Sequence, residues 1–300
     1  MLHCAAEARN LPVMRFFLKL GVPVGVKKLN GATPLFVAAQ HCQAGGATDA
    51  LQLLLEAGAD VKTELKNGFG ILHFAALGGA QGAFDFFLAR GDFKDVDVKT
   101  ASGMTPLHVA ASRGHVSLLQ YLLEKGAKKD AAWRGGVTAL HFATESGKAG
   151  AVEYLLSQKL DVNAKRADGS TALHTAALRG DVATMKLLIK LGADAAARSN
   201  DKSTALHFAA AGAAKDAVKY LVEETRAKVE EAKADEEEIL CHVKRFSRNS
   251  PWRRHHRPNG ERRPSFAWRS SNRFPDRPLL KMRRWRMLFL LRISSERIPP

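Results

Sequence analysis

Apolar residues recur in blocks at a nearly constant interval over residues 1–238, with roughly 33 positions from one block to the next. Each block holds a short run that ends in a pair of alanines, or in Ala143 and Thr144 in the fifth unit, then a break, then a second run rich in leucine. Leucines three or four positions apart are typical of an amphipathic helix that buries one face. The pattern predicts about seven units of two short helices each, stacked in a row rather than gathered around one centre. The units begin at Leu2, Leu35, Leu72, Leu107, Leu140, Leu173 and Leu206.

The fourth unit carries the clearest signals for where its helices begin and end. Thr105 precedes Pro106, which predicts a helix start, because a threonine hydroxyl caps free amide groups and proline at the first helical position loses no hydrogen bond. Ala110 and Ala111 keep one helical face thin, so that a neighbouring helix can approach closely. Gly126 ends the second helix, because glycine adopts the left-handed conformation at little steric cost. A polar, turn-forming segment then leads to the next unit.

This order of elements, T-P-L-H, A-A, G-H, L-L and G-A, resembles the ankyrin repeat, and the resemblance covers residues 1–238. It implies an all-α fold: a solenoid of stacked helix pairs joined by hairpin-like turns, whose concave surface binds other proteins. Gly70 departs from the pattern by replacing the capping threonine, and Phe36 by replacing the motif histidine. Lys159 and Thr225 stand where a terminating glycine is expected. These units should be locally weaker, by about 1 kcal/mol for a lost cap.

The resemblance also implies where a partner would bind. In ankyrin repeats the groove is lined by the hairpin tips, by the residue before the capping threonine and by the two positions after the alanine pair. Carried over to this sequence, these positions give Met104, Arg113, Trp133, Arg134, Glu145, Arg166, Asp168 and Arg179. Aromatic and arginine side chains dominate binding hot spots, and four arginines along one strip favour an acidic partner. The competing interpretation is that each is an ordinary exposed residue, or that Trp133 packs on its own hairpin.

The net charge of +16 is unevenly distributed along the chain. Residues 239–300 hold 17 Lys plus Arg against 3 Asp plus Glu, a net of +14, which leaves 29 against 27, or +2, for residues 1–238. High charge, many prolines and the loss of the repeat predict a disordered, arginine-rich tail. Nucleic-acid contact, nuclear import and membrane-surface binding around Trp285 are functional alternatives. A translated intron or a shifted reading frame would also produce so abrupt a change from lysine to arginine.

Both ends of the predicted array depart from a complete repeat. The first unit begins at Leu2 without its hairpin and cap, and an array needs a polar end unit, so we expect coding sequence upstream of Met1. At the other end, helix-forming residues continue beyond Thr225, and the last helix is expected to run through Glu223 to Glu238 as a solvated capping helix. Docking of that acidic run on the basic tail is the alternative.

Six histidines share one slot of the repeat and resemble a ladder of metal ligands. Zinc binds nitrogen at about 2 Å, so two of its ligands lie within roughly 4 Å, whereas packed helices are about 8 to 10 Å apart. We therefore expect these histidines to hydrogen-bond the backbone of adjacent turns, and no metal site is predicted. The three cysteines lack metal or disulfide spacing, which favours a reducing compartment. The histidines are His3, His73, His108, His141, His174 and His207.

The sequence shows no motif that carries catalysis: there is no glycine-rich phosphate loop, nucleophile elbow or buried carboxylate pair, and no cofactor is expected. No apolar run is long enough to span a bilayer, which favours a soluble protein, and the cysteine spacing favours an intracellular location, in the cytoplasm or alternatively the nucleus. The sequence therefore predicts a non-enzymatic interaction scaffold. Two other interpretations stay open: a nucleic-acid-associated protein anchored by its tail, and a non-catalytic fragment of a larger enzyme or channel.

Overall fold

The computed structural model of the protein describes residues 1–43 and 48–226. Within these ranges the chain forms fourteen α-helices, one 3-10 turn at Arg134–Gly136 (η1) and an isolated bridge between Trp133 and Val137, which confirms the predicted all-α fold. The helices are α1 Leu2–Glu7, α2 Leu11–Lys19, α3 Pro34–Gln40, α4 Asp49–Glu56, α5 Ile71–Gly78, α6 Gln81–Ala89, α7 Pro106–Arg113, α8 Val116–Glu124, α9 Ala139–Glu145, α10 Ala149–Ser157, α11 Ala172–Arg179, α12 Val182–Lys190, α13 Ala205–Ala211 and α14 Lys215–Arg226.

Some predictions concern residues outside the described ranges. They are the extension of the last helix beyond Arg226 and the disorder of residues 239–300. The α14 helix includes Thr225, so the chain stays helical where a terminating glycine would stand. None of the described helices is both long enough and apolar enough to cross a membrane.

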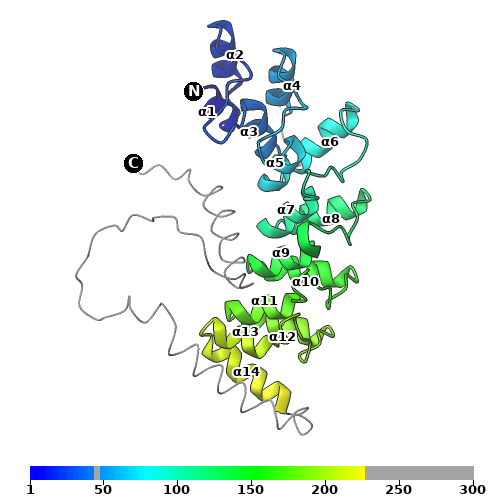
Figure 1. Cartoon of the computed structure of the whole chain (residues 1–300). Helices are drawn as coiled ribbons and strands as arrows, with labels where there is room; N and C mark the ends of the chain where they lie inside the picture. The colour runs from blue at the N-terminus through cyan, green and yellow to red at the C-terminus, as the bar shows by residue number, and fades with distance from the viewer. Residues whose placement is uncertain (44–47, 227–300) are drawn as a thin grey trace, which may run out of the picture. The chain divides into compact units, whose positions relative to one another are not determined.

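The helices form two layers (Figure 1). Consecutive odd-numbered helices pack against one another, from α1 on α3 to α11 on α13, and make an inner layer. Each even-numbered helix packs on the odd-numbered helix that precedes it, and together these helices make an outer layer. The helix pairs therefore stack in a row, as the sequence period predicts, and each unit buries apolar surface on its neighbours.

Small residues allow the inner helices to stack closely. The alanine pairs Ala110 and Ala111 of α7 and Ala176 and Ala177 of α11 are all 0 % exposed. Contact is closest at Gly78, where a Cβ atom would lie 1.7 Å from the backbone carbonyl oxygen of the preceding inner helix. Neighbouring inner helices thus meet with their backbones almost in contact, which confirms the predicted role of the thin alanine face.

A threonine–histidine pair starts each inner helix from α7 onward. The backbone amide of Thr105 donates to Nδ1 of His108 at 3.1 Å, and the threonine hydroxyl lies 2.9 Å from the same nitrogen. On the other side of the ring, Nε2 lies 2.9 Å from the carbonyl oxygen of Ala131 in the following turn. Because Nδ1 accepts from an amide, Nε2 carries the proton and donates. The predicted hydrogen bonds from the histidine rings to the backbone of an adjacent turn are confirmed for His3, His73, His108 and His174.

Glycines end the outer helices where the sequence predicts. Gly126 follows α8 with a φ of +88°, in the left-handed region that glycine occupies without strain. Lys159 follows α10 at the corresponding position with a φ of +58°. The fifth unit therefore keeps the geometry of the others although its residue has changed, at a cost of about 1 kcal/mol for a side chain in this conformation. Positive φ values also occur at Gly21, Gly58, Gly91 and Gly192.

Hairpin turns lead into the inner helices, and from the turn at 99–103 onward each turn is hydrogen-bonded to the next. Within one turn, the amide of Thr100 donates to the carbonyl oxygen of Met104 at 2.9 Å, and the other turns repeat this bond. Between turns, the amide of Ala167 donates to the carbonyl oxygen of Gly135 at 2.6 Å. The four turns from 99–103 to 198–202 therefore form a connected row at the N-terminal ends of their inner helices. The six turn segments, of five residues each, are 27–31, 64–68, 99–103, 132–136, 165–169 and 198–202.

Candidate protein-interaction surface

The ends of three inner helices carry charged residues that the sequence marks for partner binding. Arg113 ends α7, Glu145 ends α9 and Arg179 ends α11. Basic residues are favourable at a helix C-terminus, because the free carbonyl groups there carry partial negative charge, and a carboxylate is unfavourable for the same reason. The carboxylate of Glu145 is therefore unfavourable at the end of α9 unless positive charge lies close to it.

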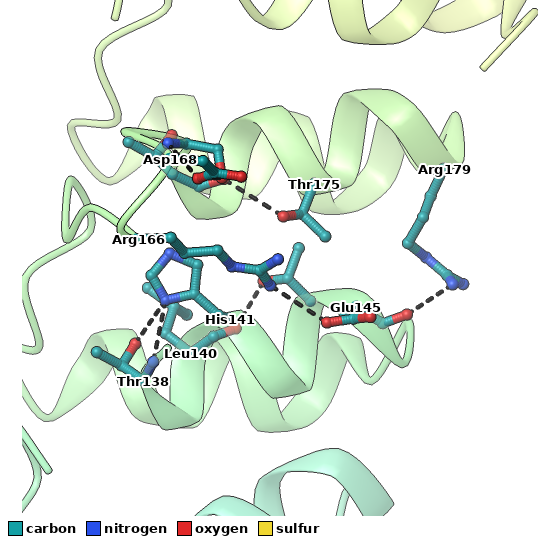
Figure 2. Close-up of polar contacts among 11 residues, drawn as sticks. Thr138, Leu140, His141, Glu145, Arg166, Asp168, Thr175 and Arg179 are labelled. Atoms are coloured by element: carbon teal, nitrogen blue, oxygen red, sulfur yellow. Dashed lines mark hydrogen bonds and ion pairs between the residues drawn. The ribbon is translucent and has the colours of Figure 1, made fainter. Parts of the chain in front are cut away.

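Two arginines of the next unit supply that charge (Figure 2). Arg166, from the turn at 165–169, places Nη2 3.2 Å from Oε2 of Glu145. Arg179 donates from Nη1 to the backbone carbonyl oxygen of Glu145 at 2.7 Å and so caps the last turn of α9. The side chain of Arg166 is only 8 % exposed and that of Glu145 28 %. These three residues form an intramolecular group, which we call the Glu145 cluster, and Arg166 is not the exposed contact that the sequence predicts.

His141 lies beside the Glu145 cluster and is completely buried (Figure 2). Its Nδ1 accepts a hydrogen bond from the amide of Thr138 at 3.2 Å and lies 2.9 Å from the hydroxyl of the same residue. Burial lowers the pKa of His141 to about 3, and the positive charge of Arg166 acts in the same direction. The ring is therefore neutral near pH 7 and serves the structure of the helix start.

Trp133 is half-buried and packs against the array itself. Its indole Nε1 donates to Oγ of Ser102 in the preceding turn at 2.9 Å. Its ring centroid lies 5.5 Å from that of Phe142 in α9, and its backbone amide donates to the carbonyl oxygen of Val137 at 2.8 Å. The alternative placed Trp133 on its own hairpin, whereas these side-chain contacts are to the preceding turn and to α9, and only part of the side chain faces outward.

Two further predicted contacts have structural roles instead. Met104 is 3 % exposed, because the residue before the capping threonine faces the core, so its side chain is not presented to a partner in this structure. The carboxylate of Asp168 accepts from the amide and the hydroxyl of Ser170, at 2.9 and 2.6 Å. Asp168 is half-buried and stabilises its own turn.

Arg113 and Arg134 are surface residues available for contact, as the sequence predicts. Both are exposed, and within residues 1–43 and 48–226 neither makes a side-chain hydrogen bond or an ion pair. Sequence reasoning missed the basic residues of the other turns, although a basic residue recurs there with the period of the repeat. The missed residues are Lys27, Lys66, Lys99, Lys165 and Arg198, and all are exposed.

Potential metal and cofactor ligands are dispersed. Among the described residues, no group of three or more His, Cys, Asp or Glu side chains is arranged to hold a metal ion. His108 uses both ring nitrogens for hydrogen bonds within the protein. Cys4 is exposed, Cys42 is buried, and both are free thiols. The chemistry of this surface is therefore that of charged and polar contacts.

The stacked helix pairs and their bonded turns define a repeat solenoid. A sequence profile described as "Ankyrin repeats (3 copies)" matches residues 1–65, 72–166 and 140–232. These matches cover most of the chain, and the protein belongs to the ankyrin-repeat family. The resemblance noted from the sequence motifs is confirmed.

Known proteins share this architecture. The crystal structure of the human ASB11 ankyrin repeat domain is similar with a TM-score of 0.57 and 25 % identity, over 73 % of this chain and 96 % of that one. The probable E3 ubiquitin-protein ligase XBOS32 of rice, Oryza sativa subsp. japonica, is 32 % identical over 155 residues, 42 % of this chain and 30 % of the ligase. The human SH3 and multiple ankyrin repeat domains protein 2 is 33 % identical over 129 residues, 43 % of this chain and 7 % of that protein. The chain thus spans less than a third of either curated relative.

Proposed function

We propose that the protein is a non-enzymatic interaction scaffold that binds another protein through the concave face made by its inner helices and hairpin turns. The match of the ankyrin profile over residues 1–65, 72–166 and 140–232 carries this proposal, because ankyrin repeats are typically protein-interaction modules. The ligase activity named for the rice relative belongs to a protein of which the matching region covers 30 %. The free thiols of Cys4 and Cys42 are compatible with the intracellular, reducing compartment that we propose.

The exposed arginines favour a partner with acidic groups. Arg113 at the end of α7 and Arg134 at the tip of the turn at 132–136 offer guanidinium groups that can bind carboxylates through two parallel hydrogen bonds. The Glu145 cluster supports this surface, since it fixes the end of α9 through the buried Arg166 and through Arg179, which stays exposed. The proposed contact surface is therefore smaller than the strip predicted from the sequence.

Affinity capture with the full chain tests this function. The variant Arg113→Glu with Arg134→Glu should lose the protein that the wild-type chain retains, because both charges on the proposed face are reversed. A matched variant, Lys94→Glu with Lys190→Glu, changes the net charge equally at exposed positions in the loop after α6 and in the last turn of α12. It should retain the partner. Equal retention by both variants, at unchanged circular dichroism and melting temperature, would contradict the proposal.

A further inference from the structure

The hairpin turns concentrate the positive charge of the array. The six five-residue turn segments together contain nine Lys plus Arg and three Asp plus Glu, a net of +6. Residues 1–226 as a whole carry 27 Lys plus Arg against 21 Asp plus Glu, also a net of +6, so the rest of that region is neutral. The net positive charge of residues 1–226 is thus gathered on one row of turns, where it creates a local field for anionic groups.

Every turn exposes at least one basic side chain. We call these residues, Lys27, Lys66, Lys99, Arg134, Lys165 and Arg198, the basic row. Within the described ranges, none of the first five lies within 4.0 Å of a carboxylate. Two acidic residues of the turns are engaged locally, Asp168 with Ser170 and Asp201 with the amide of Ser203 at 3.1 Å, which leaves Glu64 as the exposed acidic residue without such a bond. The net field along the row is therefore positive.

Contacts between turns hold the central and later members of the basic row in fixed positions. The turn at 132–136 is joined to the preceding one by Trp133 and Ser102, and to the following one through the backbone of Gly135 and Ala167. The amide of Asn200 joins the last two turns by donating to the carbonyl oxygen at position 168, at 2.9 Å. A surface already ordered before binding loses less conformational freedom when a partner docks.

The spacing of the row fits an extended polypeptide. Stacked helices lie about 8 to 10 Å apart, so successive turns are separated by about that distance. A chain in the polyproline II conformation has about three residues per helical turn and advances about 3.1 Å per residue, which places every third side chain on the same side and opposite a new hairpin turn. We infer that the basic row binds an acidic protein segment in an extended, polyproline II conformation, with one carboxylate at about every third residue. The inference rests on the proposed function, because it specifies the chemistry of the partner for the same face.

The composition of the turns favours a protein segment over single-stranded nucleic acid. Proteins that bind single strands combine basic residues with aromatic side chains on which bases stack. Trp133 is the one aromatic residue in the six turn segments, and its ring already packs against Phe142 while its indole nitrogen donates to Ser102. The row therefore offers charges at intervals and no free stacking surface within those segments.

Fluorescence anisotropy with two labelled peptides tests the inference on the full chain. One peptide repeats Glu-Ser-Thr six times, and the other has the same composition with all glutamates in one block. The row variant is Lys27→Glu, Lys99→Glu and Lys165→Glu. Its control, Lys19→Glu, Lys94→Glu and Lys190→Glu, makes the same charge change at exposed positions outside the turns. The spaced peptide should bind the row variant at least tenfold more weakly than the wild type, and the control variant less than threefold more weakly.

The wild-type chain should also prefer the spaced peptide to the block peptide. The inference would be overturned if the two peptides bound equally well, or if the two variants lost equal affinity. It would also be overturned if the row variant bound the spaced peptide as well as the wild type does, because the anion site would then lie elsewhere. The inference would give way to nucleic-acid binding if the wild-type chain bound an 18-nucleotide oligo-dT more tightly than the spaced peptide and the row variant did not bind the oligonucleotide. A Lys→Gln version of the row variant repeats the test if charge reversal disturbs folding. If the captured protein depends on Arg113 and Arg134 but not on the three lysines, the proposed function stands and the inference fails.

Discussion

The outer helices of the first and fourth units have equivalent sequences but different surroundings. In α8, Leu118 and Tyr121 are 1 % and 6 % exposed, and the hydroxyl of Tyr121 donates to Asp85 of α6 at 2.7 Å. In α2, the corresponding Val13 and Phe16 are 37 % and 58 % exposed. The apolar positions are the same, but α6 contacts α8 from the preceding unit, whereas no described helix precedes the pair formed by α1 and α2.

This difference shows that burial in the array is a property of two adjoining units rather than of one helix. The same position is part of the core in the fourth unit and part of the surface in the first. Stability in such an array is approximately a sum of the stability of each unit and of the contacts with its nearest neighbours. Equivalent substitutions should therefore have unequal effects along the chain.

Acidification should produce the largest effect, because the middle units bury neutral histidines. Burial lowers the pKa of His73 and His108 to about 4 and that of His141 to about 3, against 6.5 for an ordinary histidine. The unfolded chain binds protons at these sites more readily than the folded chain, so their contribution is complete above pH 6.5 and is lost as the pH falls toward 4. Between pH 7 and 5, urea unfolding should show a loss on the order of 5 kcal/mol.

A single substitution isolates one part of that pH effect. His108→Gln can still donate to the carbonyl oxygen of Ala131 but cannot take up a proton, so the variant should be less stable at pH 7 and should lose less on acidification. An identical pH slope in the variant and the wild type would show that the buried rings do not control the response to acid.

Matched truncations should give the next largest difference. Leu118→Ala in α8 removes a fully buried side chain and should lower the free energy of unfolding by about 3 kcal/mol. Val13→Ala at the equivalent position of α2 should cost about 0.5 kcal/mol, because the side chain is already partly exposed. Urea titrations followed by circular dichroism measure both free energies. Equal costs would mean that the side chains of Val13 and Leu118 are equally buried, which would contradict the comparison.

The Glu145 cluster offers a smaller test, in a part of the array where both neighbours are present. Glu145→Gln should cost about 2 kcal/mol, since it leaves the buried charge of Arg166 without its carboxylate, although the partial exposure of Glu145 reduces the effect. In the double variant with Arg166→Met, the total should be smaller than the sum of the two single costs. Strict additivity in this double-mutant cycle would mean that the ion pair contributes nothing.

The helix ends of the fourth and fifth units should show the smallest effect. Lys159→Gly relieves a left-handed lysine and should stabilise the protein by up to about 1 kcal/mol, partly offset by the greater freedom of glycine in the unfolded chain. Gly126→Lys, at the equivalent position, should destabilise it by about 1 kcal/mol. Melting temperatures of the two variants should move in opposite directions, and a shift in the same direction would contradict the shared geometry.

The starts and ends of the helices could be predicted from the sequence, because local chemistry determines them. Pro106 and the terminal Gly126 act through their own backbone, so the repeat reveals their role, whereas the Thr105 hydroxyl lies 2.9 Å from Nδ1 of His108 instead of capping a free amide. The structural, non-metal role of His108 was also predictable. Two ligands of one metal ion lie too close together to come from separate stacked helices. These features require no knowledge of tertiary contacts.

The burial and the contacts of individual surface residues could not be predicted in this way. Arg166 meets Glu145 only after α9 and the next turn have packed, across 21 residues of sequence. Met104 occupies the position expected for a contact residue, yet its side chain faces the core. A position carried over from a family gives the place of a residue along the repeat, whereas the direction of its side chain depends on which neighbours fill the space around it.

The threonine–histidine contacts recur at Thr105, Thr138, Thr171 and Thr204, with the same step along the sequence each time. A second copy of residues 107–139, inserted directly after the first, would find every donor and acceptor already in phase on both sides. Tandem duplication within the gene can therefore lengthen the protein without any redesign of its interior, and each added copy would enlarge the face available to a ligand.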